Sequence, residues 1–249
     1  MIVAEIYVQG DGKIAGFVIR GHSGGGKHSH GYNVRCAEVS MLSQSAYLGI
    51  RQYLQREVSV ANHEYGGLGI ELKAAPDALT EAIFQTMLIG LREVKHVAPK
   101  VIQIRLIRLD KSAEENLQSV VNSMNPKPKK PLLNVEVESV KIRADIYRRG
   151  EKIIGFALTE FDSAVIDELN IYCAGTWILI RSAFACIKNH LKRDVVSLTG
   201  DTRFAMRLKN SPDDITESVF QTMLIGLREL EKQAPQIINV RENSLGGET

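Results

Sequence analysis

The chain has 249 residues, of which 44% are hydrophobic and 24% are charged. This balance is typical of a globular protein, so it excludes extensive disorder and collagen-like structure. The net charge of only +2 argues against a dedicated nucleic-acid binder, which needs clustered positive charge. The length allows two domains of about 110 residues each.

The predicted elements begin with two strands. Ile2–Val8 alternates, and the turn signal Gly10-Asp11-Gly12 leads into a second strand at Ile14–Arg20. From Cys36 as far as Tyr53, apolar residues recur at the spacing of a helix. These patterns predict a β-hairpin followed by a helix.

The remainder of the first half continues in a mixed order. A short strand is predicted at Gly69–Lys73, and Pro76-Asp77 opens a second helix that Pro99 stops. Val101–Ile107 is the last predicted strand. The order ββαβαβ combines a hairpin with helices, which indicates the α+β class rather than an alternating parallel fold.

An internal repeat divides the chain. The ten residues Phe84–Glu93 recur without change as Phe220–Glu229, and looser matches upstream follow in the same order. This identity exceeds what core packing requires, because volume-conserving swaps are tolerated. We therefore expect two related ββαβαβ domains that meet partly through this helix, as a pseudo-twofold dimer within one chain.

A proline- and lysine-rich segment separates the two copies. Its run Asn125–Pro131 is typical of a stiff, solvated connector. We place the first domain at residues 1–109, the linker at 110–134 and the second domain at 135–249. Because the dimer-like pair lies on one chain, we expect a monomer.

Membrane and secretory signals are absent from the sequence pattern. Arg181 interrupts the longest apolar run, Trp177–Ile180, well short of the roughly 20 residues that span a membrane. Met1–Glu5 lacks a basic region followed by an apolar one. Three cysteines fit free thiols better than a disulfide framework. We expect a cytoplasmic protein without membrane contact.

The segment between the second strand and the first helix carries the candidate chemistry. His22 ends the strand, and Cys36 lies at a helix N-terminus, where the helix dipole and free amides stabilise a thiolate. The loop of thirteen residues between them has room to bring imidazole beside thiol, the pairing that activates a cysteine nucleophile. The alternative is a buried cysteine at the helix start and a solvated loop histidine.

Two further readings of this segment are open. His22, His28, His30 and Cys36 carry zinc-ligating groups, although their spacing matches none of the usual zinc patterns. Gly21–Lys27 resembles a phosphate-binding loop, but a histidine follows where magnesium binding requires Ser or Thr. Neither reading accounts for the segment as well as a Cys–His pair.

A family resemblance rests on three parts of the segment: Gly21-His22-Ser23, Gly31, and Val34–Ser40 with its Cys-Ala-Glu-Val-Ser run. Together they resemble the signature of the ribosomal-processing cysteine proteases called Prp, and the resemblance extends over residues 1–107. It implies a Cys–His protease that trims the N-terminal extension of a large-subunit ribosomal protein. Members of the family are homodimers.

The resemblance implies a role for each matching residue. Cys36 is the nucleophile, and His22 is the general base that later protonates the leaving amine. Ser40 matches a family serine four residues after the cysteine, on the same face of the helix. Its hydroxyl is expected either to support the site or to bond back to a main-chain carbonyl.

One departure from the family pattern concerns the residue three positions before the cysteine. It is usually acidic, and here it is Asn33, whose amide oxygen can orient imidazole but carries no charge. Main-chain N–H groups of Cys36 and of Gly24, Gly25 and Gly26 are candidates for stabilising the oxyanion.

The second copy lacks the dyad. Aligning the two hairpins puts Phe161 at the position of His22 and Trp177 at that of Ser40. Cys173, the counterpart of the candidate nucleophile, therefore has no local base and is expected to be a small buried hydrophobe. The third cysteine is expected to face the core as well.

The main hypothesis is a cysteine peptidase without cofactor or metal, acting on a protein substrate and using one active and one inert half. The alternatives are a catalytically inactive module that grips a protein tail, which Asn33 favours, and a metal-binding loop protein.

Overall fold

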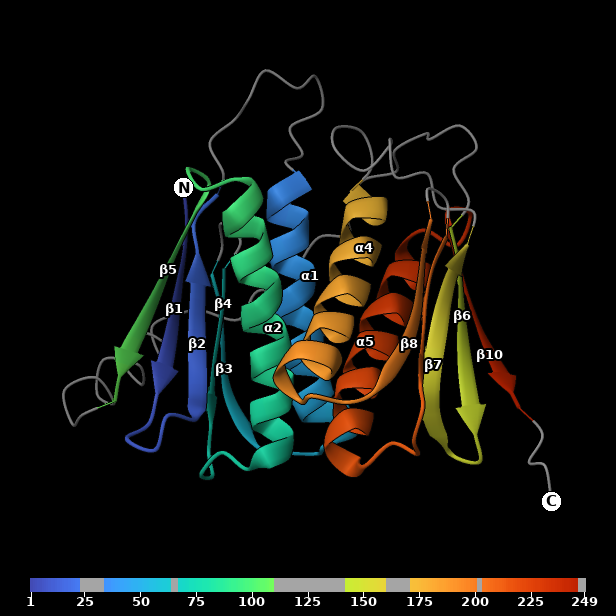
Figure 1. Cartoon of the computed structure of the whole chain (residues 1–249). Helices are drawn as coiled ribbons and strands as arrows, with labels where there is room; N and C mark the ends of the chain where they lie inside the picture. Colours follow the sequence, from blue (N-terminus) through green and yellow to red (C-terminus); the bar gives the residue numbers. More distant parts are fainter. Residues whose placement is uncertain (23–33, 64–66, 110–141, 160–170, 201–202, 246–249) are drawn as a thin grey trace, which may run out of the picture.

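The computed structural model describes residues 1–22, 34–63, 67–109, 142–159, 171–200 and 203–245. It has two similar halves, each with a mixed five-stranded sheet, and the helices of both halves lie together between the sheets (Figure 1). The predicted α+β class and the paired arrangement are confirmed. The predicted linker lies outside the described residues, so the domain bounds stay a prediction.

The described elements follow the same order in both halves. The first half contains β1 (Ile2–Val8), β2 (Ile14–Arg20), α1 (Val34–Leu48), the π-helical turn η1 (Gly49–Tyr53), β3 (Val58–His63), β4 (Gly67–Leu72), α2 (Ala78–Val97) and β5 (Ile102–Arg108). The second contains β6 (Ile142–Arg149), β7 (Lys152–Thr159), α4 (Ile171–Ala185), η3 (Cys186–His190), β8 (Val195–Gly200), β9 (Arg203–Leu208), α5 (Asp214–Gln233) and β10 (Ile238–Ser244).

The two sheets have equivalent strand orders, β3-β4-β2-β1-β5 and β8-β9-β7-β6-β10. In each sheet the first and last strands along the chain pair in parallel, and the other neighbours are antiparallel. The register shifts at Tyr7/Val8 in one hairpin and at Tyr147/Arg148 in the other. The halves therefore share topology as well as sequence.

The predicted ββαβαβ order is wrong by one strand per half, because each half reads ββαββαβ. The missing strands, β3 and β8, lie at sheet edges. Val58 and Val60 of β3 are only partly buried against the core cluster, Ala61 is buried on the other face of the sheet, and most of β8 is exposed. Strands with so little burial lack the strong apolar alternation by which sequence predicts a strand.

The hydrophobic cores of the two halves interlock through the helices. Ile178 of α4 belongs to the core cluster of the first half, while Met41 of α1 and Ala82 of α2 belong to that of the second. α1 packs against α4, α2 against α5, and each also contacts the other helix of the partner half. The predicted meeting of the two copies through the repeated helix is confirmed.

The first residues of the repeat tie each long helix to its own sheet. Asp77 and Asp213 cap α2 and α5 by accepting hydrogen bonds from main-chain amides of the first turn. One turn later, the Glu81 carboxylate accepts a hydrogen bond from the Ile14 amide at 2.7 Å, and Glu217 accepts one from Ile153 at 2.9 Å. These equivalent bonds fix the helix against the hairpin.

The repeated glycine permits the close approach of helices across the halves. A Cβ at Gly90 would overlap the Ser182 hydroxyl and lie 2.5 Å from Leu42 Cδ2. A Cβ at Gly226 would overlap the Ser45 hydroxyl and lie 2.8 Å from a methyl of Leu179. Because both copies face the same crowded surroundings, the same residue is required in both.

Cys186 belongs to this helix interface, where the halves differ. In one half, Gly49 leaves room for Thr222, because a Cβ there would overlap the threonine hydroxyl. In the other half, Cys186 takes the equivalent place. Its thiol donates a hydrogen bond to the Ala82 carbonyl at 3.8 Å and also bonds to the side chain of Thr86. The thiol thus fills space between the halves, and the expectation that this cysteine faces the core is confirmed.

One helix in the described part of the chain, Ile171–His190, is long and apolar enough to cross a membrane by length and composition. However, 67% of its apolar window is buried within the protein. It packs against α1, α2 and α5. This packing accounts for the apolar composition as that of a core helix.

Gly90→Ala is expected to lower the free energy of unfolding by about 1–3 kcal/mol, although alanine favours helices by about 1 kcal/mol over glycine. The added methyl group would overlap Ser182 and Leu42. Urea unfolding measures the change. Gly10→Ala is the control, because no atom lies within 4 Å of its Cβ position; equal effects of the two variants would contradict the crowding.

Asp77→Ala is expected to cost about 1 kcal/mol of stability at neutral pH. Burial alone would raise the pKa of Asp77, but hydrogen bonds from Thr80 and Arg56 lower the pKa overall. A lowered folded-state pKa stabilises the protein above the ordinary carboxyl value and loses that contribution as pH falls. Urea unfolding at neutral pH and at about pH 3 should therefore show a smaller difference in acid; an unchanged difference would contradict the assignment.

Candidate active site

Cys36 lies in the first turn of α1, as its third residue. Its side chain is partly exposed and packs against the edge of the first core cluster. Main-chain amides in the first turn of a helix have no partner within the helix, and the dipole there favours negative charge. The predicted position at a helix N-terminus is confirmed, and it suits a reactive thiol.

His22 directly follows β2 and is exposed. The residue before it, Gly21, has φ +89°, and a Cβ there would lie 2.5 Å from the Met1 carbonyl oxygen. The Met1 nitrogen donates a hydrogen bond to the His22 carbonyl at 2.6 Å. A glycine in this conformation and a tethered main chain hold the start of the histidine side chain beside β1.

The two candidate catalytic residues lie at the same end of the first half, because β2 ends and α1 begins there (Figure 1). The chain between them, with Asn33 and Gly24, Gly25 and Gly26, lies outside the described residues. The topology thus places the end of β2, which precedes His22, and the start of α1, which carries Cys36, at the same end of the first half. The catalytic roles of the two residues stay predictions.

An ion pair flanks Cys36 on the first turns of α1. Arg35 Nη1 donates to both carboxylate oxygens of Glu38, at 2.8 and 3.0 Å. Glu38 is only 3% exposed, and the guanidinium of Arg35 compensates its buried charge at close range. The sequence offered an i, i+3 Arg–Glu signal for this pair, but no sign that the glutamate is buried.

Ser40 lies one helical turn after Cys36 and is partly buried. Its main-chain carbonyl accepts a hydrogen bond from the Ser43 hydroxyl at 3.1 Å. The back-bonding expected of a helix serine is thus made by Ser43 toward Ser40. The role of the Ser40 hydroxyl itself stays a prediction.

The metal and phosphate readings depend largely on loop residues. His28, His30 and Gly24–Gly26 lie outside the described residues. Within the part of the chain that the structure describes, no group of three or more His, Cys, Asp or Glu side chains is placed to hold a metal ion.

The second half presents its counterpart cysteine differently. Cys173 is the third residue of α4, as Cys36 is of α1, but it is 1% exposed and lies in the second core cluster. The pKa of the Cys186 thiol is raised to about 11, mainly by burial, with a hydrogen bond from Thr86 opposing the shift and the charge of Glu81 adding to it. The expectation that both cysteines of this half are buried is confirmed.

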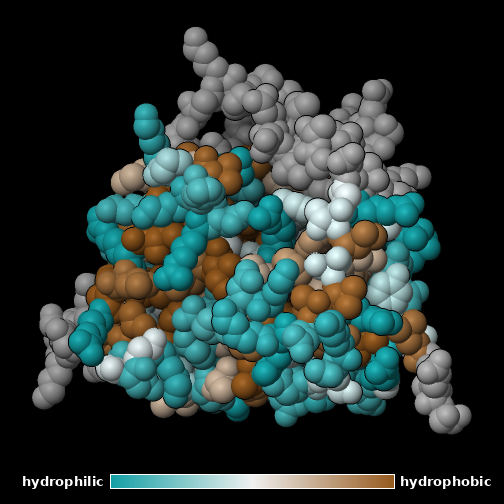
Figure 2. Space-filling model, viewed as in Figure 1, coloured by the Kyte–Doolittle hydropathy of each residue, from teal (hydrophilic) through white to brown (hydrophobic). Residues whose placement is uncertain are grey.

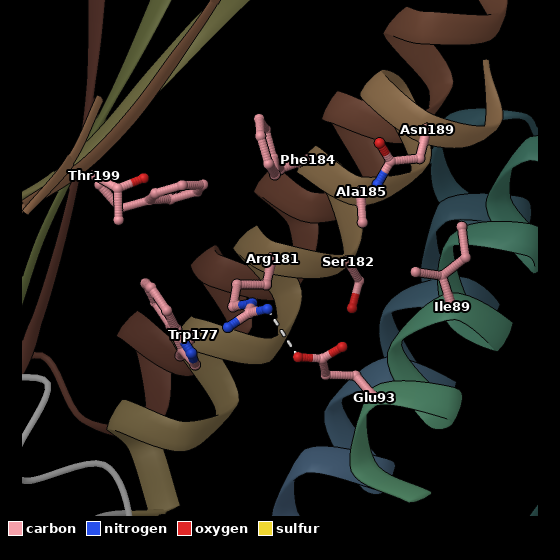
Figure 3. A pocket seen from close by; sticks show the side chains of 10 residues that line it. Ile89, Glu93, Trp177, Arg181, Ser182, Phe184, Ala185, Asn189 and Thr199 are labelled. Carbon is pink, nitrogen blue, oxygen red and sulfur yellow. Dashed lines mark ion pairs between the residues drawn. The ribbon is translucent and has the colours of Figure 1, made fainter. Parts of the chain in front are cut away.

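A pocket of about 340 Å³, not predicted from the sequence, is lined by ten residues of α2, α4, η3, β8 and β9, most of them from the second half (Figure 3). The sequence contains one signal for the pocket: the alignment of the two halves places the large ring of Trp177 where the first half has the small Ser40. Trp177 lies one helical turn after Cys173 on α4, so the pocket begins on the same face of the helix as that cysteine.

Comparison with known proteins connects the first half to one family. Residues 1–103 match the family model described as the cysteine protease Prp. No curated protein matches the chain.

Solved structures match about half of the chain. The ribosomal processing protease Prp from S. aureus, in complex with a covalently linked product peptide, is 21% identical, and the match covers 43% of this chain and 99% of that one with a TM-score of 0.40. SMU.848 from Streptococcus mutans is 22% identical, and the match covers 44% and 96% with a TM-score of 0.39.

A limited reaction of the native protein with iodoacetamide is expected to modify Cys36 before the other two cysteines. Cys36 is partly exposed, whereas Cys173 and Cys186 are buried and the pKa of Cys186 is raised to about 11. Peptide mapping by mass spectrometry identifies the modified residue. Equal labelling of all three in the folded protein would contradict the burial, and labelling in urea is the control.

Proposed function

Because residues 1–103 match the family model of the cysteine protease Prp, we propose that the chain is a cysteine peptidase that uses Cys36 as nucleophile and His22 as general base. The observation that carries the proposal is the placement of Cys36. It is partly exposed in the first turn of a helix, at the end of the domain where His22 leaves β2.

The proposed reaction follows from the two side chains. His22 accepts the thiol proton of Cys36, and the thiolate attacks the carbonyl carbon of the peptide bond. Amide groups at the start of α1 stabilise the negative oxygen that forms. The leaving amine takes the proton from the imidazolium, and water activated by His22 then hydrolyses the thioester and restores the thiol.

The second half acts in this proposal as an inert partner. Cys173 is buried among apolar side chains, and its half has Phe161 at the position of the histidine. The interlocked helices hold α1 against α4, so the second half supports the element that carries the nucleophile. One chain then has one reactive site.

The proposed substrate is a protein with an extended segment, in particular the N-terminal extension of a large-subunit ribosomal protein. This choice follows the resemblance of the Gly-His and Cys-Ala-Glu-Val-Ser motifs to the family signature. A cytoplasmic monomer that meets the newly made ribosomal protein is part of the same proposal.

Cleavage of the extended ribosomal-protein precursor from the same organism tests the proposal. The wild-type chain is expected to remove the extension, while Cys36→Ala and His22→Ala each lower kcat/KM by about a thousandfold or more. Cys173→Ala is the matched control, because it removes the equivalent thiol of the inert half, and it should leave the rate unchanged.

Two results would count against the peptidase. Cleavage by Cys36→Ala at the wild-type rate would exclude that residue as the nucleophile. Binding of the precursor by the wild-type chain without cleavage would favour the inactive binding module, for which Asn33 in place of an acidic residue is the motivating observation.

A further inference from the structure

The pocket in the second half lies where the two halves meet. α4 forms its floor, with Trp177, Arg181 and Phe184 between two walls (Figure 3). Ile89 and Glu93 of α2, from the first half, form one wall, and Thr199 of β8 and Phe204 of β9 contribute to the other. Its volume of about 340 Å³ is enough for a large side chain, at the lower end of ligand pockets.

Three aromatic rings give the pocket its apolar character. The Phe204 ring packs edge-to-face with Trp177, with centroids 5.6 Å apart, and with Phe184, with centroids 5.2 Å apart. Aromatic pairs of this kind form rigid walls that favour apolar and aromatic partners. The rings come from α4 and β9, so both elements define the shape of the pocket.

The charges around the pocket argue against a cationic ligand. The Arg181 guanidinium lies 5.5 Å from the Trp177 ring centroid, and Lys188 Nζ lies 5.3 Å from that of Phe184. The protein's own cations therefore already occupy ring faces that would bind one. Arg181 also pairs with Glu93 at 2.8 Å, so the acidic group at the mouth is compensated.

Two of the three aromatic rings, those of Trp177 and Phe204, are specific to the second half. Trp177 and Phe204 stand where the first half has Ser40 and Leu68, by the alignment of the helices and of the paired strands. The shared scaffold therefore forms without these rings at the equivalent places. Their presence on one side gives the second half a surface feature that folding of the scaffold does not demand.

The edge of the second half's sheet lies beside the pocket. β8 is the last strand of its sheet and pairs with β9 alone within the described residues. Its six residues carry no charge and no proline, and Val196 and Leu198 on its outer side are 55% and 61% exposed. Natural edge strands usually carry features that prevent pairing, and an uncharged edge is a template for another strand.

Thr199 connects these two features, because it belongs to β8 and lines the pocket. In the same view as Figure 1, Figure 2 shows hydrophobic surface among hydrophilic residues on the face where α4 and β8 lie. A strand added to β8 would alternate its side chains between the pocket side and the side of Val196 and Leu198.

We propose that the second half binds an extended peptide segment that pairs with β8 and inserts an aromatic side chain into the pocket over α4. Main-chain hydrogen bonds to the strand edge supply the register, and the pocket selects the inserted side chain. Valine or similar side chains on the other face of the segment pack on Val196 and Leu198. This binding does not involve Cys36.

Trp177 is the only tryptophan of the chain, so its fluorescence reports on the pocket directly. The probe is the acetylated and amidated peptide Lys-Thr-Val-Phe-Val-Thr-Lys, added to the Cys36→Ala chain so that cleavage plays no part. A saturable change in Trp177 fluorescence is expected. The peptide with Ala in place of Phe should bind about tenfold more weakly or worse, as should one with alternate main-chain nitrogens methylated.

Matched variants of the two halves locate the binding site. The fluorescence anisotropy of the labelled peptide measures its binding to each variant. Phe184→Ala should weaken binding about tenfold, whereas Tyr47→Ala at the equivalent position of α1 should not. Val196→Glu on β8 should weaken it similarly, whereas Ser59→Glu on β3 should not. Val196 is exposed, so this variant remains informative if Phe184→Ala fails to fold.

Several results would overturn the proposal. They are the absence of any saturable change, equal binding of the Phe and Ala peptides, and equal weakening by the variants of both halves. Binding of N-acetylphenylalanine amide as tightly as the peptide would make the pocket a small-molecule site. A response to phosphatidylcholine vesicles alone would make it a lipid site. Because Cys36→Ala is used throughout, each result is independent of peptidase activity.

Discussion

The close contact of helices across the two halves is the constraint on which the rest of the structure depends. Gly90 and Gly226 allow α2 and α5 to approach α4 and α1 so closely that a methyl group at either position would overlap a neighbouring side chain. Residues of each half complete the core of the other. The ten identical residues of the repeat therefore answer two demands at once, packing on their own sheet and packing on the other half.

On this common frame the halves differ at the starts of α1 and α4. Cys36 is partly exposed there, whereas Cys173 is buried, so the same residue type at the same helical position has different chemistry available to it. The second half in turn carries the rings of Trp177 and Phe204 beside an uncharged strand edge. In the account proposed here, the first half supplies the reactive thiol and the second half supplies a peptide-binding surface, a division of labour that two identical copies would lack.

Much of this organisation could be predicted from the sequence, and the failures have physical causes. The hairpin strands Ile2–Val8 and Ile14–Arg20 were predicted to the residue, because both faces and the turn give strong local signals. β3 and β8 were missed because edge strands bury little. The positions of Cys36 and His22 followed from element ends, but the pocket depends on α2, α4 and β9 meeting in space, which no local pattern encodes.

The central claim is that one chain carries one reactive Cys–His site, and active-site titration tests it most directly. The measurement is intact mass and peptide mapping after reaction with a peptidyl chloromethyl ketone, compared between wild type and His22→Ala. The account predicts one adduct per wild-type chain, on Cys36, and a greatly slowed reaction without His22. An adduct on Cys173, or an equal rate of modification in both proteins, would contradict it.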